Sequence, residues 1–239
     1  MGGALFAATQ LFFTINILVV EGTSRYPEAE LWQTAHVKEG DNLLFLSPNG
    51  IKARLIQAFA YVKDVQVTRH WPDKLTLTIT EKEPCSYLEQ EGQCWVMDTD
   101  GTLLEKTTPS NVSHLPHITG VTLLAPKLGE IAAFAEADSN RIAPLYALLQ
   151  VLCQTQLLAD VSLVDVGEPY ALSLRYKNRF TVQLGMPENL EEKLAQVTEI
   201  EDYLESSRVG IINVASSPAR FQPDKPLVED NAEEQKETP

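Results

Sequence analysis

The sequence predicts an α+β protein with two folded domains: a small β-α-α-β-β module, then a larger, mostly antiparallel β domain with flanking helices. Three observations support this. Residues 11–83 show the order strand, helix, helix, strand, strand; a proline follows at position 84; and the later residues form short strand patterns around two helical stretches. Two helices on one face of a small sheet make a stable two-layer module. Since a proline cannot donate to a strand ladder, the boundary is placed there, giving domains at 11–83 and 84–225.

The first module starts with a strand predicted over residues 11–21, where apolar residues alternate from Phe13 onward. A short helix follows, with Pro27 in its first turn. The second helix has Ser47 as its N-cap and Pro48 at its first position. The sequence therefore predicts a strand followed by two helices on one side of the sheet.

Two strands close the module, at residues 62–70 and 75–81. Strict alternation in the second strand puts three apolar side chains inward and three threonines outward. The inward set is Leu75, Leu77 and Ile79, and the outward set is Thr76, Thr78 and Thr80.

The second domain begins with a hairpin of residues 85–90 and 93–97 around Glu91-Gly92. A helix is predicted over 142–158, with Pro144 in its first turn, and a second over 187–206, which has an acidic start and an apolar stripe. The remaining strands are predicted at 102–105, 161–166, 170–176, 180–184, 210–214 and 219–221.

The chain is acidic, with 33 Asp and Glu against 19 Lys and Arg and a formal net charge of -14. This charge repels a phosphate backbone, so we expect no nucleic-acid partner. Residues 226–239 carry mostly acidic and polar side chains without aromatics, and we expect a disordered tail there.

Residues 3–20 contain no charge, which suits a membrane span or a signal segment, yet no Lys or Arg precedes them. Because the alternation from Phe13 onward favours a strand, we interpret residues 1–10 as the remnant of a transmembrane segment.

The sequence contains no convincing motif for metal binding or catalysis. The Asp98-x-Asp100-Gly101 pattern places glycine too early for an EF-hand and suits a hairpin turn. His114 and His117 have Pro116 between them and no adjacent ligand cluster. No nucleophile or phosphate-loop motif occurs, so we expect no enzyme, no catalytic or metal site and no cofactor.

Carboxylates and cysteines do not change this expectation. Glu81 and Glu83 fit an exposed strand end beside Lys82. The three cysteines, at positions 85, 94 and 153, match no zinc or redox spacing. A Cys85–Cys94 disulfide conflicts with the hairpin register, so buried or idle thiols are expected.

Taken together, "INILVVEG" (15–22), "YPEAEL" (26–31), "GDNLLFL" (40–46), "VKDVQVTRHWPDKLTLTITEKEP" (62–84) and "WVMDTDGTLL" (95–104) resemble the FtsQ/DivIB family of bacterial cell-division proteins. The run that closes the family's POTRA module matches Arg69, Trp71, Pro72, Glu81 and Pro84. Further likeness lies at "LPHITG" (115–120) and "GIINVASSPARFQP" (210–223), while residues 121–160 match weakly.

The resemblance implies a divisome scaffold for septum formation that binds FtsL and FtsB/DivIC-type coiled-coil proteins. It also implies a single-pass protein of the cell membrane, anchored by an upstream helix, with extracytoplasmic POTRA and β domains. The alternative is a POTRA-type translocation or assembly module that handles extracytoplasmic clients, which a C-terminal β-barrel would support.

A binding mechanism follows if residues 219–221 form the last strand of a sheet, because one row of its backbone groups is then unpaired and open to strand addition. The resemblance points to this edge and the preceding helix, so the predicted partner-binding residues are Ala219, Arg220, Phe221 and Gln222, with Tyr203 on the helix. Arg69-His70-Trp71 suits either a ligand patch or a turn in which Trp71 caps the sheet and Arg69 is solvated.

Overall fold

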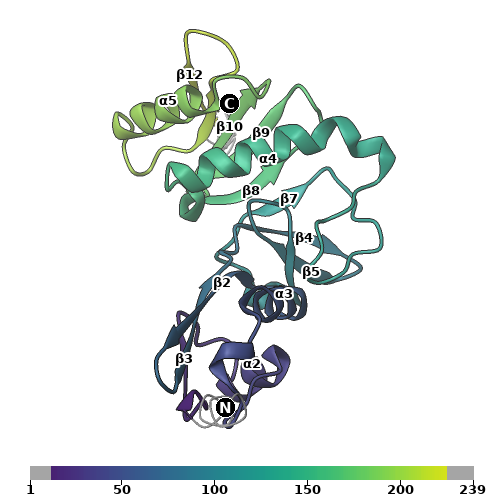
Figure 1. Ribbon diagram of the computed structural model, residues 1–239. Helices are drawn as coiled ribbons and strands as arrows, with labels where there is room; N and C mark the ends of the chain where they lie inside the picture. Colours follow the sequence, from purple (N-terminus) through teal and green to yellow (C-terminus); the bar gives the residue numbers. More distant parts are fainter. Residues whose placement is uncertain (1–11, 225–239) are drawn as a thin grey trace, which may run out of the picture.

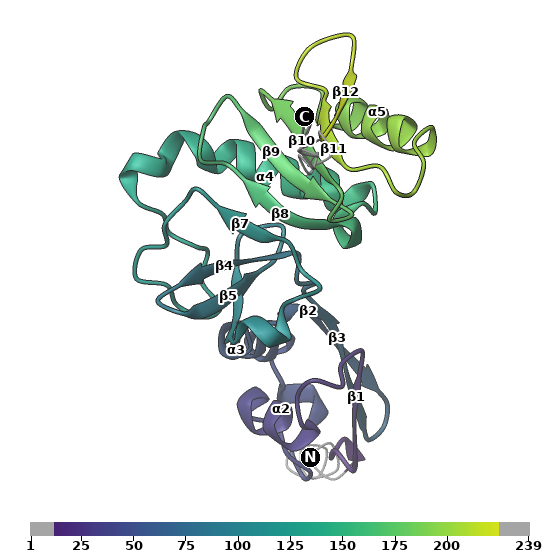
Figure 2. The same ribbon diagram turned by 180° about the vertical axis from the view of Figure 1, so that it is seen from behind.

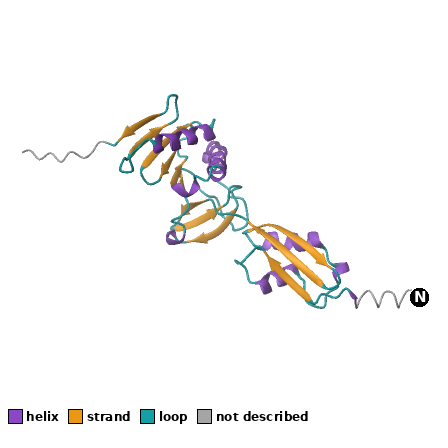
Figure 3. Ribbon diagram, turned by 90° about the vertical axis from the view of Figure 1, so that its left-hand side faces the viewer, coloured by secondary structure: helices purple, strands orange, loops and turns teal. Residues whose placement is uncertain are grey.

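The computed structural model describes residues 12–224. Two domains lie end to end along an elongated molecule, with the described chain starting at one end and finishing at the other (Figure 1, Figure 3). The predicted remnant at residues 1–10 and the predicted tail at 226–239 lie outside the described residues.

The N-terminal domain contains strands β1 (Ile17–Glu21), β2 (Val62–His70) and β3 (Lys74–Glu81) in the order β1-β3-β2. β1 runs parallel to β3, and β2 runs antiparallel to it. Helices α2 (Glu28–Ala35) and α3 (Pro48–Ala58) and the short 3-10 helix η1 (Leu43–Phe45) complete the domain. This is the predicted strand-helix-helix-strand-strand order.

Local sequence explains these helices. Ser47 accepts a hydrogen bond from the Gly50 N–H at 3.2 Å, and Pro48 takes the first helical position, as predicted. Pro27 is the N-cap of α2 and not part of its first turn. Leu31, Ile51 and Leu55 are buried, and so are Leu75, Leu77 and Ile79 of β3.

Two details of this domain differ from the prediction. The first strand starts at Ile17 and not at residue 11. Thr76 does not face solvent: it is buried, because β3 is the central strand and Val19 of β1 and Thr68 of β2 lie beside it in the register.

Residues of the C-terminal domain form one sheet of nine described strands, in the order β12-β11-β10-β9-β8-β7-β4-β5-β6. Five of its eight strand pairs are antiparallel, as predicted for a mostly antiparallel domain. The strands are β4 (Ser86–Gln90), β5 (Gln93–Met97), β6 (Leu103–Thr107), β7 (His117–Thr119), β8 (Val161–Asp165), β9 (Leu172–Tyr176), β10 (Phe180–Gly185), β11 (Gly210–Asn213) and β12 (Arg220–Pro223).

Helices α4 (Ser139–Gln154) and α5 (Leu190–Asp202) cover one face of this sheet, as seen from both sides in Figures 1 and 2. Buried leucines of α4 and the apolar stripe of α5 pack on the strands in one core. That stripe consists of Leu190, Leu194 and Val197.

Both helices begin or end away from their predicted limits. Helix α4 begins at Ser139, three residues early, so Pro144 lies inside the helix and not in its first turn. At its start the Arg141 guanidinium donates to the Asp138 carboxylate at 2.8 Å. Helix α5 is shorter than residues 187–206, because Asn189 has a positive φ of 54° and the backbone leaves the helix at Tyr203.

The two domains meet through a small apolar cluster near Pro84. Tyr61 of the N-terminal domain is buried together with Cys94, Val96 and Leu104 of the C-terminal domain. Arg25 lies over the Tyr61 ring at 3.7 Å and pairs with Glu105 of β6 at 4.0 Å. The joint therefore has its own apolar and ionic contacts.

Across residues 12–224, we find no helix with the length and apolar character needed to cross a membrane.

Candidate functional site

Strand β12 is an edge of the nine-stranded sheet. Within the described chain its hydrogen-bonded neighbour is β11, with Ile212 opposite Phe221 in an antiparallel register. The strand covers Arg220–Pro223, so it begins one residue later and ends two residues later than predicted.

The backbone of β12 has an inner and an outer row of polar groups. The Asp224 N–H donates to the Val209 carbonyl at 3.2 Å, so the groups of Asp224 face β11. Backbone groups alternate in direction along an antiparallel strand. The groups of Gln222 and Arg220 therefore also face β11, and those of Phe221 and Pro223 face outward. This explains why the strand includes Pro223: its missing N–H lies on the unpaired side.

Side chains of β12 divide between the two faces of the sheet. Phe221 is half-buried and meets Phe180 edge to face, with ring centroids 6.0 Å apart. Arg220 and Gln222 are exposed, and alternation places them on the opposite face. The Phe221 side chain therefore packs β12 against the core, while the backbone N–H and C=O of Phe221 point outward from the sheet.

Tyr203 is 84% exposed and occupies the C-cap of α5, one residue beyond the helix. The segment that follows it leads into β11, the neighbour of β12. Val209, at the end of that segment, is also exposed and receives the hydrogen bond from Asp224. Tyr203 thus lies at the start of a segment that supports the edge.

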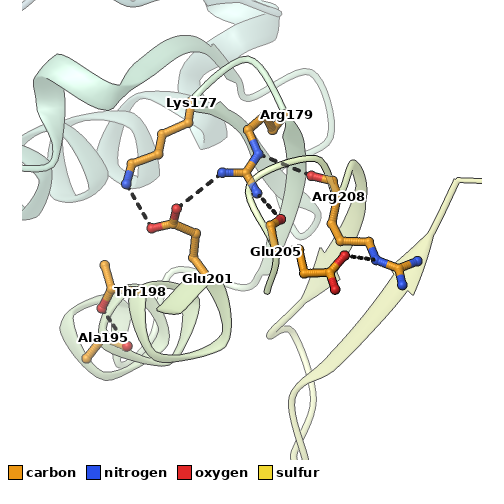
Figure 4. A network of polar contacts seen from close by, with 7 residues as sticks. All are labelled: Lys177, Arg179, Ala195, Thr198, Glu201, Glu205 and Arg208. Atoms are coloured by element: carbon orange, nitrogen blue, oxygen red, sulfur yellow. Dashed lines mark hydrogen bonds and ion pairs between the residues drawn. The ribbon is translucent and has the colours of Figure 1, made fainter. Parts of the chain in front are cut away.

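A polar network fixes this segment (Figure 4). Arg179 donates from Nε to the Arg208 carbonyl at 3.1 Å and from Nη2 to the Glu205 carbonyl at 3.0 Å. Its Nη1 lies 3.4 Å from Oε1 of Glu201 on α5. One arginine thereby ties α5 and the following loop to the start of β10, and this draws the chain out of the helix.

Lys177 binds the second carboxylate oxygen of Glu201 and so belongs to the same network. Its Nζ donates to Oε2 of Glu201 at 2.8 Å, and this hydrogen bond raises the pKa of Lys177 above its ordinary value. The same carboxylate thus binds two cations, and it is only 15% exposed.

Three residues of the predicted signature, Arg69, Trp71 and Pro72, lie at the end of β2 and in the β2–β3 turn, in the N-terminal domain and away from β12. The turn interpretation expected a solvated Arg69, and this is wrong. Arg69 is half-buried, and its Nη2 donates to the Leu46 carbonyl at 2.7 Å. Trp71 is 53% exposed and contacts Phe13 edge to face, and Pro72 follows it in the β2–β3 turn.

Glu81 and Pro84 belong to the joint between the domains. Glu81 is not a solvated strand end, because it accepts a hydrogen bond from Thr23 and pairs with Arg25 at 3.7 Å. Both residues line a cleft of about 420 Å³ that also contains Asp98. Asp98 accepts the N–H groups of Asp100 and Thr102, as the predicted turn requires, and lies 3.6 Å from Lys82. These carboxylates thus have structural partners.

Cysteines show one contact that the sequence did not reveal. All three are free thiols, and Cys85 and Cys94 are buried as expected. Interaction between the thiols of Cys85 and Cys153 of α4 raises the pKa of Cys85 and lowers that of Cys153. No spacing rule could signal this pair, because 67 residues lie between its members. Among residues 12–224, no group of three or more His, Cys, Asp or Glu side chains could hold a metal ion.

Comparison with known families covers almost all the described chain. Residues 13–82 match the sequence model described as POTRA domain, FtsQ-type. Residues 87–215 match the one described as Cell division protein FtsQ/DivIB, C-terminal. The two matches meet at the joint around Pro84.

Individual relatives agree with these matches. Cell division protein DivIB of Clostridium acetobutylicum is 24% identical over 190 residues, which are 79% of this chain and 74% of that protein. Cell division protein FtsQ of Anaeromyxobacter sp. (strain K) is 28% identical over 217 residues, 86% of this chain and 70% of that one. A solved structure of the major extracytoplasmic domain of DivIB from Geobacillus stearothermophilus aligns with a TM-score of 0.33 at 14% identity, covering 53% of this chain and 99% of that one.

Proposed function

The chain belongs to the FtsQ/DivIB family of cell division proteins, and from this premise we propose that it is a non-enzymatic divisome scaffold that adds a strand of a partner to β12. The proposed partners are FtsL and the FtsB/DivIC-type coiled-coil proteins. Its role is to hold these partners at the site of septum formation.

The observation that supports this proposal is the open outer row of β12. An added strand pairs with the N–H and C=O of Phe221 and with the carbonyl of Pro223, which are the groups that alternation directs outward. Since Pro223 lacks an N–H, pairing beyond Phe221 is incomplete. The short edge thus favours one register and restricts unspecific strand addition.

Side chains near the edge supply specificity. Arg220 and Gln222 are exposed on one face of β12, where they can contact alternate side chains of an added strand. Tyr203 is the most exposed large hydrophobic side chain at this end, and aromatic residues of this kind often dominate binding energy. We assign Arg220, Gln222 and Tyr203 to partner contact, and Ala219 and Phe221 to the pairing backbone.

We also propose that the two domains are extracytoplasmic and anchored by a single span upstream of the described residues. Residues 3–20 carry no charge, which suits a chain emerging from a membrane. The Geobacillus DivIB domain is itself described as extracytoplasmic.

The decisive experiment measures amide hydrogen exchange of the full chain with and without the extracytoplasmic part of an FtsB/DivIC-type partner. In the free chain, the Gln222 N–H is paired with β11 and exchanges slowly, while the Phe221 N–H exchanges fast. Strand addition slows exchange of the Phe221 N–H in the complex. A complex that forms with the Phe221 amide still exchanging fast would contradict strand addition at β12.

Variants test the same edge by pull-down. Phe221→Asp and a deletion from Pro218 onward should both abolish binding while far-ultraviolet circular dichroism is retained. Tyr203→Ala should weaken binding several-fold. The matched control is Tyr170→Asp, because Tyr170 is also a highly exposed aromatic residue but lies before β9; it should bind like the wild type.

A further inference from the structure

Exposed apolar side chains gather at the end of the molecule opposite β12. Phe12 is 72% exposed, Phe45 68% and Trp71 53%, and Ile17 and Leu44 are also exposed. We call these five residues the apolar tip. They come from the segment before β1, from β1 itself, from η1 and from the β2–β3 turn.

Backbone contacts bring these segments together. The Leu43 N–H of η1 donates to the Phe13 carbonyl at 2.9 Å. The Asn16 N–H donates to the carbonyl of Asp73, in the β2–β3 turn, also at 2.9 Å. The segments that carry the apolar tip are therefore adjacent in the folded domain although they are separate in the sequence.

Two side-chain contacts fix the tip further. The Phe13 and Trp71 rings meet at 5.0 Å and 81°. The Arg69 guanidinium donates to the Leu46 carbonyl, which joins the end of β2 to the residue after η1. Trp71 is thus fixed by a ring contact, and Phe45 lies in a segment that Arg69 ties to β2.

The tip is not needed to complete the core of its domain. Ile15 and Leu43, the neighbours of the exposed residues in sequence, are fully buried and fill that core. Large apolar side chains that cluster at the surface, beyond what the core uses, mark an interaction site. The nearby charges are mixed, with Lys74 beside Asp73 and Asp41, so the site does not select a strongly charged partner.

We propose that the apolar tip inserts into the interfacial layer of a lipid bilayer, with Trp71 and Phe45 at headgroup depth. Tryptophan suits this layer because its ring is apolar at one end and carries an N–H at the other, and phenylalanine suits the apolar face of an interfacial segment. The chain reaches the tip at Phe12 directly from residues 1–11, MGGALFAATQL, which contain no charge. This inference rests on the proposed membrane placement of the protein.

The position of the tip explains how a bilayer contact would orient the molecule. The N-terminal domain, which carries the tip, lies at one end of the elongated molecule and β12 at the other (Figure 1). A bilayer contact at the tip therefore fixes the N-terminal domain against the membrane and leaves the outer row of β12 free for a partner. The contacts at the Tyr61 joint connect the two domains between these ends.

The experiment uses tryptophan fluorescence of the full chain with phosphatidylcholine vesicles whose acyl chains carry bromine near the headgroup. Trp71→Phe provides the reference, and the difference from wild type isolates Trp71 emission. We expect vesicles to shift this difference spectrum to shorter wavelength and to quench most of it. Since the charges at the tip are mixed, added phosphatidylglycerol should change the quenching little.

Sedimentation of the vesicles separates the outcomes. The proposal is overturned if the chain does not sediment with vesicles, or if it sediments while Trp71 emission is unchanged. Quenching that requires anionic lipid also overturns it. A vesicle-independent shift that grows with protein concentration would instead assign the tip to self-association.

Two controls complete the design. Trp95→Phe, which removes a half-buried tryptophan of the C-terminal domain, should leave the Trp71 quenching intact. Phe45→Ser should reduce it. Partner binding at β12, measured separately, distinguishes a failure of this inference from a failure of the proposed scaffold function.

Discussion

Strands β6 and β12 form the two edges of the nine-stranded sheet, and their outer backbone groups have different surroundings. At β6, the Leu103 N–H donates to the Glu130 carbonyl at 2.9 Å, and the Gly129 N–H donates to the Leu103 carbonyl at 2.8 Å. Thr102 forms a bridge with Ile131 just before the strand. At β12, the outward groups of Phe221 have no such covering segment among the described residues.

This difference shows which edge the fold leaves available. Long sheets protect their edges against unwanted pairing with loops, prolines or short strands. A loop pairs with the start of β6 at Leu103, whereas β12 is limited by its length and by Pro223. An edge strand that is short but not covered by another segment is suited to pairing with a specific partner strand. Four predictions test the contacts that hold the two edge strands in place.

The largest effect is expected at Phe180, which is fully buried beneath Phe221. Phe180→Ala leaves a cavity under β12 and should lower the free energy of unfolding by about 3–5 kcal/mol. Urea denaturation measures this loss. Phe45→Ala, at an exposed position, should change stability by less than about 0.5 kcal/mol; equal losses in the two variants would refute the packing argument.

The next largest loss of stability is expected at Asp98. Its carboxylate accepts two backbone N–H groups of the turn leading to β6 and lies near Lys82. Asp98→Ala leaves the buried Thr102 N–H without this acceptor and should cost about 2–3 kcal/mol. Thermal and urea unfolding give the value. Asp100→Ala removes an exposed carboxylate from the same turn and should be nearly neutral, so a similar loss there would contradict the assignment.

Much of this architecture could be predicted from alternation and caps. The limits of β2 agree with the prediction and the β4–β5 hairpin differs only in starting at Ser86, because apolar spacing and the Glu91-Gly92 turn are local signals. The early end of α5 could not be predicted. It depends on Arg179, which lies far back in the sequence and draws the carbonyls of Glu205 and Arg208 out of the helix.

The same distinction applies to the candidate site. Prolines and the final position suggested an edge strand at residues 219–221, yet only the register with β11 shows which backbone groups face outward. The apolar tip was not foreseen at all. Trp71 stood out in the sequence, but its segment meets those of Phe12 and Phe45 only through contacts of the neighbouring residues Phe13, Leu43 and Asp73 in the folded domain.

A smaller effect is expected at Arg179, which supports the open edge through the loop before β11. Arg179→Ala should lower the free energy of unfolding by about 1–2 kcal/mol, since its side chain is partly exposed and its hydrogen bonds are partly replaced by water. Partner affinity at β12 should fall more than stability does. Arg175→Ala, which removes one 3.3 Å hydrogen bond to Thr181, is the control and should preserve both.

The smallest effect is expected at Lys177, at the border of the same network. Its hydrogen bond to Glu201 raises the pKa of Lys177 above the ordinary 10.5, so the stabilisation is complete below that value and is lost as the pH rises through the higher pKa of the folded state. Lys177→Met should therefore cost less than about 1 kcal/mol at pH 7, because the pair is partly exposed. Urea denaturation at several pH values should show a constant difference from wild type between about pH 7 and 9 that shrinks above pH 10.5. A difference that persists at high pH would mean that Lys177 acts by packing, and that Arg179 alone supplies the charge that holds Glu201 beside the open edge.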